Sequence, residues 1–198
     1  MDEGGGRGGQ GGGRGGPQRG RGRGRGREPR ESEDSIETSV IRIYRCSKVV
    51  KGGRTFSFGA LVVAGDRSGQ IGIGYGKANE VPSAVEKAGK EARRSMVKVP
   101  MVDKTIPHQV LGRSGASRVM LVPARPGTGV TAGKSVRPLL ELAGISDILT
   151  KCYGSTSPKN LLKACIDALS RLQSAQVVRD RRGVDLPDHA GELETAEA

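Results

Sequence analysis

The sequence predicts an α+β protein made of two small domains. A chain of 198 residues has room for two such domains. Apolar strand-like runs joined by glycine-rich turns precede an amphipathic helical pattern, and Pro100 separates this set from a second set of strands and helices. We therefore divide the chain into a low-complexity tail with an acidic linker (1–35), a first domain (36–99), a second domain (100–183) and an acidic tail (184–198).

The first domain is expected to hold a three-stranded antiparallel sheet and one helix. β-branched and apolar runs bounded by turn formers predict strands at 40–50, 55–64 and 70–75. Pro82 suits the first turn of a helix, where a missing N–H costs nothing. An apolar stripe extends this helix to the break at Pro100, through Val81, Ala84, Val85, Ala88, Ala92, Met96 and Val99.

The third predicted strand has glycine at every second residue, in the segment GIGYGK (72–77). Because successive side chains of a strand point to opposite faces, one face of the sheet carries almost no side chains. We interpret this face as a flat surface that an RNA backbone can approach closely. Cations flank it at both ends, at Lys51, Arg54 and Lys77.

The second domain is expected to contain three strands and two helices. Apolar runs predict strands at 105–111 and 118–123, joined by the loop 112–117, and at 147–153. A glycine-rich loop (124–133) leads to a short helix (135–143) that ends at Gly144, a natural left-handed cap. Ser157 and Pro158 mark the start of the last helix. Its buried stripe is Leu161, Leu162, Cys165, Ile166, Leu169 and Leu172.

Charge indicates a polyanionic partner. The formal net charge is +12, and the excess lies in the middle of the chain, where residues 40–137 hold 18 Lys/Arg against five Asp/Glu. So much like charge destabilises a compact fold unless a bound polyanion compensates it. With no Trp, two Phe and three Tyr, recognition by base stacking is disfavoured. Backbone and shape recognition of folded RNA is favoured instead.

The cations of the first helix lie away from its apolar stripe: Lys87, Lys90, Arg93, Arg94 and Lys98. A solvated helix face and an RNA-binding face both explain this placement. The net charge favours the RNA-binding face.

Both ends of the chain are biased in composition. Between residues 4 and 27 there are 14 Gly and seven Arg, so this segment has nothing to bury and is expected to be disordered. Loose RNA contact and a merely solubilising role both remain open for residues 1–30. The acidic residues 184–198 are expected to be flexible.

The cysteines and histidines show no catalytic or metal-binding spacing. Cys46, Cys152 and Cys165 are expected to be small buried hydrophobes in a reducing compartment. His108 and His189 have no neighbours suited to a triad or a metal site. No apolar run is long enough for a membrane span or a signal core. We expect a soluble intracellular protein without enzyme activity, metal or cofactor.

Two glycine motifs imitate nucleotide-binding loops. The segment PGTGVTAGKS (126–135) ends like a Walker A loop, but Thr128 stands where that motif requires glycine. The segment 72–77 misses the dinucleotide motif because its third glycine comes one residue early. For 126–135, a purely structural turn and a loop that contacts RNA phosphates through its amides and Lys134 both remain open.

Four segments together resemble a known family. They are SKVVKGGRTFSF (47–58), AGDRSGQIGIGYGKANEVPSAVEKA (64–88), GTGVTAG (127–133) and YGSTSPKN (153–160). These segments are similar to the bacterial form of the fifth protein of the small ribosomal subunit, over about residues 36–183. The resemblance implies an N-terminal domain like double-stranded-RNA-binding domains. It also implies a two-layer C-terminal domain with a left-handed β-α-β crossover.

The resemblance further implies a structural RNA-binding protein of the small subunit. Such a protein binds small-subunit ribosomal RNA and stabilises the head of the subunit relative to its body. It neighbours small-subunit proteins four and eight, shapes the channel through which messenger RNA (mRNA) enters, and contributes to decoding accuracy. It is cytoplasmic and ribosome-bound, with no membrane partner and no small-molecule substrate.

The resemblance and the basic residues together give the candidate sites. The basic hairpin around residues 48–54 would touch RNA of the head, and Arg45 with Lys48 would lie near the mRNA channel. Gly129 and Arg137 match the region that meets protein four. The RNA-binding candidates are Arg45, Lys48, Lys51, Gly52, Gly53, Arg54, Lys77, Lys87, Arg93, Arg94, Arg113, Arg118, Gly127, Thr128 and Lys134.

Two rival functions make different predictions. A free RNA chaperone would use the Arg-Gly tail as its active element, so that deleting residues 1–30 would abolish RNA annealing. A nucleotide-dependent enzyme would need the loop 126–135 to bind ATP or GTP, which equilibrium dialysis detects. The ribosomal hypothesis requires residues 36–183 to suffice for specific assembly.

Overall fold

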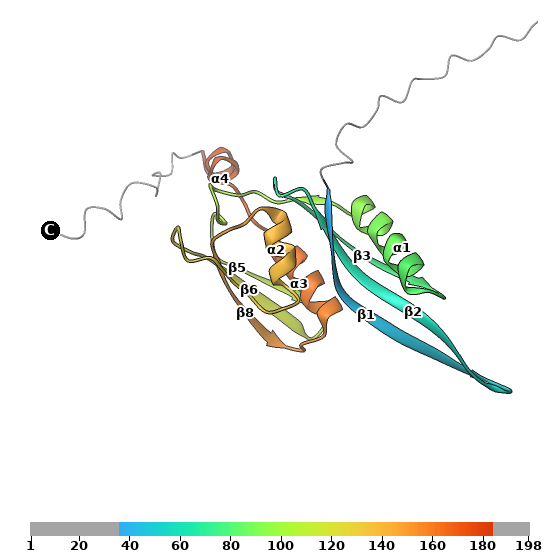
Figure 1. Ribbon diagram of the computed structural model, residues 1–198. Coiled ribbons are helices and arrows are strands. Elements are labelled where there is room, and N and C mark those ends of the chain that lie inside the picture. Colours follow the sequence, from blue (N-terminus) through green and yellow to red (C-terminus); the bar gives the residue numbers. More distant parts are fainter. Residues whose placement is uncertain (1–35, 184–198) are drawn as a thin grey trace, which may run out of the picture. The chain divides into compact units, whose positions relative to one another are not determined.

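The computed structural model describes residues 36–183, and Figure 1 shows its elements. The first sheet is antiparallel, in the order β1-β2-β3-β4. Its strands are β1 (Glu37–Val50), β2 (Gly53–Gly65), β3 (Gln70–Ala78) and the short β4 (Val97–Lys98). The helix α1 (Val81–Arg94) follows β3 and packs on this sheet. The three predicted strands and the helix are confirmed, whereas β4 was not predicted.

The glycine face of β3 is covered by α1, so its interpretation as an open RNA surface is wrong. Gly72, Gly74 and Gly76 are buried, and a Cβ atom at any of them would overlap backbone atoms of α1. The residues opposite are the fully buried Ala84, Ala88 and Ala92. Two strand residues advance about 6.8 Å and four helix residues about 6.0 Å, so the two small-residue rows stay matched. The helix backbone therefore lies directly on the sheet.

The helix α1 ends at Arg94, before the end predicted at Val99. The hydroxyl of Ser95 donates to the carbonyl oxygen of Ile73 at 2.8 Å, and Val97 then pairs with β3. Val99 is only 3% exposed, so it does face the core, but from an extended segment. The apolar spacing therefore continued past the helix because burial continued, not because the helix did.

The second sheet is mixed, in the order β5-β6-β8-β7, with β7 parallel to β8. Its strands are β5 (Val110–Ser114), β6 (Ser117–Pro123), β7 (Val130–Thr131) and β8 (Ile148–Gly154). The helix α2 (Arg137–Ala143) joins β7 to β8, which is the expected β-α-β unit, and it ends at Gly144 with φ 90°. The helices α3 (Pro158–Ser170) and α4 (Ala175–Arg182) follow. The handedness of the crossover stays a prediction.

Parts of this second half differ from the sequence prediction. Residues 105–109 lie outside any strand, because β5 begins only at Val110. Pro107 in this segment has no N–H for a strand ladder. Residues 112–114 belong to β5 rather than to a loop, and Ser114 pairs with Ser117. The helix α4 escaped prediction because it is polar and has no buried residue.

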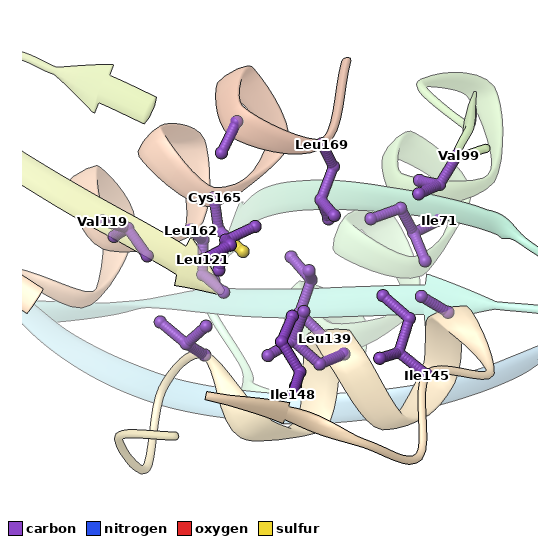
Figure 2. Packing of buried hydrophobic residues seen from close by; sticks show 14 of the residues in the cluster. Ile71, Val99, Val119, Leu121, Leu139, Ile145, Ile148, Leu162, Cys165 and Leu169 are labelled. Atoms are coloured by element: carbon purple, nitrogen blue, oxygen red, sulfur yellow. The ribbon is translucent and has the colours of Figure 1, made fainter. Parts of the chain in front are cut away.

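One hydrophobic cluster joins the two sheets. It takes large side chains from the first sheet, the second sheet and both α2 and α3: Leu61, Val63, Ile71, Val119, Leu121, Leu139, Leu140, Ile148, Leu162 and Leu169. Figure 2 shows labelled members from both halves of the chain within this cluster. The two halves predicted from sequence therefore share a core.

The turn between β2 and β3 binds the C-terminal end of α2. The amides of Arg67 and Gly69 donate to the carbonyl oxygens of Leu142 and Ala143, at 2.9 and 3.0 Å. A helix end leaves such carbonyls without partners inside the helix. The carboxylate of Asp66 accepts two further amides of this turn, at 2.7 and 2.9 Å. Hydrogen bonds as well as apolar packing thus hold the halves together.

The cysteines differ in burial, which predicts an order of reactivity. Only Cys165 is fully buried, whereas Cys46 and Cys152 are half-buried, so the prediction of three buried cysteines is wrong for two of them. Burial raises the pKa of the Cys165 and Cys152 thiols, and the thiolate is the reactive form. Iodoacetamide should therefore label Cys165 only in denaturant, as mass spectrometry of tryptic peptides will report. Rapid labelling of Cys165 in the folded protein would contradict this core.

Candidate nucleic-acid interface

The basic hairpin, residues 45–54, carries the densest group of predicted RNA contacts. The strand β3 pairs with β2 only from Phe58 to Gly65. On the turn side of Phe58, β1 and β2 therefore pair only with each other. Figure 1 shows the hairpin extending past the third strand. Its cations Arg45, Lys48, Lys51 and Arg54 are all exposed, and residues 45–54 include no acidic side chain. A phosphate backbone can therefore reach a concentrated positive charge here.

The tip of the hairpin requires glycine for its backbone conformation. Gly52 has φ 97° and Gly53 has φ 142°, values that L side chains rarely adopt. Apart from the adjoining residues, no atom of the described residues lies within 4 Å of a Cβ atom built at either position. Both predicted tip residues are thus exposed and unobstructed.

Apolar side chains accompany the cations of the hairpin. Val49 is 72% exposed and Phe56 is 43% exposed. The guanidinium carbon of Arg45 lies 4.8 Å from the centroid of the Phe56 ring, a cation–π contact that restrains Arg45. Exposed apolar area beside unpaired cations is typical of a surface that a partner covers.

The cations of α1 differ in their pairing. Lys90 contacts Glu86 at 2.6 Å, and this hydrogen-bonded ion pair holds the pKa of the Glu86 carboxyl below its ordinary value. Within residues 36–183, no ion pair engages the exposed Lys87, Arg93 or Arg94. Arg93 and Arg94 lie in the last turn, where cations also stabilise the helix dipole. Their positions therefore agree with a solvated face and with an RNA-binding face.

Arg113 and Arg118 face each other directly across β5 and β6, and both are exposed. Like charges in such a cross-strand pair destabilise a sheet. The nearby carboxylate of Asp167 does not neutralise them, since it accepts the backbone amide of Arg113 and pairs with Arg171, both at 2.9 Å. A bound phosphate would offset this repulsion.

The glycine loop uses some of its amides within the protein. Gly127 and Gly129 have φ 87° and 76°, and the amide of Gly129 donates to the buried Asp147 at 2.9 Å. Thr128 bonds to the carbonyl oxygen of Arg125 through both its amide and its hydroxyl. These amides are therefore engaged, which favours the structural-turn interpretation of the loop backbone. Lys134, in contrast, is exposed.

The candidate residues thus lie on several parts of the fold rather than in one pocket. The structure brings together the members of the basic hairpin, the pair Arg113 and Arg118, and the loop residues 127–129. Lys77 lies two residues after Tyr75, on the same face of β3, and its ammonium is 5.8 Å from the centroid of the Tyr75 ring. Scattered exposed cations suit an extended polyanion, whereas a small anion would need convergent groups.

Sequence reasoning missed an aromatic and cationic cluster. The rings of Tyr44 and Tyr75 meet edge-to-face, with centroids 6.3 Å apart. Arg42 lies 5.4 Å from the Tyr44 centroid, and Lys159 of α3 lies 4.4 Å from the Tyr75 centroid. The scarcity of aromatic residues hid this cluster, because two of only three tyrosines meet in space from distant sequence positions.

No group of three or more His, Cys, Asp and Glu side chains among residues 36–183 is arranged to hold a metal ion. In the same range, no helix is long and apolar enough to cross a membrane. His108 has a structural contact instead, since its Nε2 accepts the amide of Gln173 at 3.1 Å.

The fold and the surface together define an α+β protein whose exposed cations suit a nucleic-acid backbone. Family comparison makes this specific: the family description "Ribosomal protein S5, N-terminal domain" matches residues 36–100, and "Ribosomal protein S5, C-terminal domain" matches residues 112–182. The chain belongs to the ribosomal protein S5 family. Members of this family are structural components of the ribosome and not enzymes, which confirms the resemblance noted in the sequence.

Similar proteins come from several bacteria, and each is named small ribosomal subunit protein uS5. The protein of Rhodopirellula baltica is 53% identical over 161 residues, which cover 81% of this chain and 91% of the relative. That of Syntrophobacter fumaroxidans is 54% identical over 144 residues, covering 73% and 87%. That of Chloroflexus aurantiacus is 52% identical over 147 residues, covering 74% and 83%.

Proposed function

We propose that this chain binds small-subunit ribosomal RNA and fixes the head of the subunit relative to its body. The proposal is carried by a set of exposed cations that form no ion pair within residues 36–183, and the basic hairpin is the densest part of this set. Each contact with a phosphate is modest and salt-dependent, but many together fix the register of a protein on RNA.

The shared core supports a positional mechanism. RNA contacts on the first half (the basic hairpin and α1) and on the second half (Arg113, Arg118 and Lys134) would be held at fixed separations by one packed cluster. Close-packed cores deform little, so they can transmit a constraint between RNA segments. In this proposal, residues 36–99 and residues 100–183 each form one RNA-binding module.

The finer role follows the family resemblance. Arg45 and Lys48 would lie near the channel through which mRNA enters, and Gly129 and Arg137 would meet small-subunit protein four. Protein eight is the second proposed neighbour, and the compartment is the cytoplasm. Control of accuracy would come from an interface whose open and closed forms differ by about a few kcal/mol.

The Arg137→Glu variant tests the role in accuracy. Arg137 pairs with Glu141 at 2.8 Å on the exposed side of α2, so charge reversal should cost the fold only about 0.5 kcal/mol. We expect altered misreading in a near-cognate reporter assay and normal incorporation into small subunits. Arg171→Glu is the matched control, because Arg171 forms the equivalent four-residue-spaced pair with Asp167. Equal misreading by both variants, or by neither, would remove the proposed role of Arg137.

The test of the main proposal is sedimentation of a native lysate through a high-salt sucrose gradient. Stoichiometric co-migration of the full chain with the small subunit is the expected result. Release of the chain to the top of the gradient would contradict an integral role, and the free RNA chaperone would then become the better hypothesis.

A further inference from the structure

An open groove of about 400 Å³ lies where β2 and β3 of the first half meet α1 and α3. Its apolar lining comes from Leu61, Ile73 and Ile166, and Tyr75 forms an aromatic wall. Two exposed cations of α3, Lys159 and Lys163, also line the groove. This combination of apolar surface, one ring and two cations belongs to none of the predicted RNA contacts.

The position of Tyr75 follows from the strand pattern. Gly72, Gly74 and Gly76 point toward α1, so Tyr75 points to the opposite face of the sheet. A Cβ atom at Gly59 of β2 would come within 2.5 Å of the Tyr75 hydroxyl oxygen. The absence of a side chain at Gly59 therefore gives the ring its place on the sheet.

The two lysines are placed against their own electrostatic preference. Lys159 lies in the first turn of α3, where the helix dipole disfavours a cation. Lys163 follows four residues later, and like charges at this spacing destabilise a helix. Within the described residues, neither lysine is in an ion pair, although the Tyr75 ring lies 4.4 Å from the Lys159 ammonium. An anion at this end of α3 would relieve both penalties.

We propose that the groove holds one unstacked base of the ribosomal RNA, with its flanking phosphates against Lys159 and Lys163. This inference rests on the proposed function and specifies how the RNA is held. Any of the four bases can pack on an aromatic and aliphatic surface, and lysines compensate the negative charge of the RNA backbone. The exposed carboxylate of Glu91 also lines the groove and can accept a hydrogen bond. It can accept from the exocyclic amino group of adenine, cytosine or guanine, or from the ring N3–H of uracil, so it excludes none of the four bases.

The direct test is cross-linking at 254 nm in small subunits reconstituted with the full chain, read by mass spectrometry. The expected result is a nucleotide adduct on the tryptic peptide 68–77, at Tyr75. An adduct on hairpin peptides without one on 68–77 would overturn this inference and leave the proposed function standing. Failure of the wild-type chain to incorporate would instead overturn the proposed function.

Variants separate base binding from a merely structural ring. Tyr75→Leu should weaken binding to particles reconstituted without this chain by roughly 10- to 100-fold, at an unchanged salt slope. Tyr75→Phe should restore binding. The matched control is Tyr153→Leu, since Tyr153 is 44% exposed on β8, away from the groove lining. A lower melting temperature of Tyr75→Leu with unchanged affinity would show that the ring only braces α3.

The lysines give an independent readout. The double variant Lys159→Met and Lys163→Met should lower the salt slope of binding by about 1.4, the value for two phosphates of a single strand. An unchanged slope would contradict phosphate contacts at this groove.

Discussion

Replacing Gly74 with valine is expected to prevent α1 from packing on the first sheet and to leave the protein unfolded or insoluble. A Cβ atom at Gly74 would overlap the carbonyl oxygen of Ala88 and lie 2.5 Å from the amide nitrogen of Ala92. Both are backbone atoms of a packed helix, so no side-chain movement relieves the clash. The cost should exceed about 3 kcal/mol, a large part of the stability of a small domain.

Gly89→Ala provides the matched control on the same helix. Among the described residues, nothing outside the adjoining helix backbone lies within 4 Å of a Cβ atom built at Gly89, and alanine in a helix interior is favoured over glycine by about 0.5–1 kcal/mol. We therefore expect Gly89→Ala to raise the melting temperature measured by circular dichroism. A wild-type melting temperature for Gly74→Val would show that α1 does not lie on β3 as described.

The glycine strand illustrates what the sequence can and cannot decide. Alternation at 72–77 correctly predicted a strand with one bare face, but it gave no indication of what covers that face. The face is covered by the helix residues Ala84, Ala88 and Ala92. Their spacing matches that of the glycines only when the helix is packed against the strand. Bare sheet faces admit a helix backbone as readily as an RNA backbone. The net charge biased the interpretation toward RNA.

Local patterns were reliable where local chemistry decides the structure. Pro158 begins a helix and Gly144 ends one, because a missing N–H and a positive φ are properties of single residues. The end of α1 depended instead on the pairing of Val97 with β3, a contact between segments 26 residues apart. Burial of residues on an extended segment imitates helical periodicity, so such ends are not readable from one segment.

The candidate site likewise has one part that the sequence could predict and one part that it could not. The basic hairpin was predictable because its charge and its turn are contiguous, and the structure places 45–54 on an exposed pair of strands. The groove beside Tyr75 was not predictable, since its ring and its lysines come from residues about 85 positions apart and meet only in the fold. Contact chemistry between distant segments has no signal in a single sequence.

Neutralising two cations of the basic hairpin should weaken RNA binding far more than neutralising two cations that are paired with carboxylates of the protein. The variant Lys48→Ala with Arg54→Ala loses two exposed charges that have no ion-pair partner in the described part of the chain. Each phosphate contact contributes a slope of about 0.9 in log K against log salt, so the slope should fall by about 1.8. Relative to equal binding at 1 M salt, this slope difference corresponds to an affinity loss of roughly 60-fold at 0.1 M salt.

The control variant Lys90→Ala with Arg171→Ala removes the same net charge. Lys90 is paired with Glu86 and Arg171 with Asp167. Because a carboxylate of the protein already neutralises each cation, neither is expected to contact a phosphate. The control should bind nearly as the wild type does, because a general loss of positive field changes association modestly and is screened at 0.1 M salt. Filter binding of small-subunit ribosomal RNA particles across a salt series measures both slopes. Equal slopes for the two variants would mean that net charge alone attracts RNA, and the hairpin would then lose its special role.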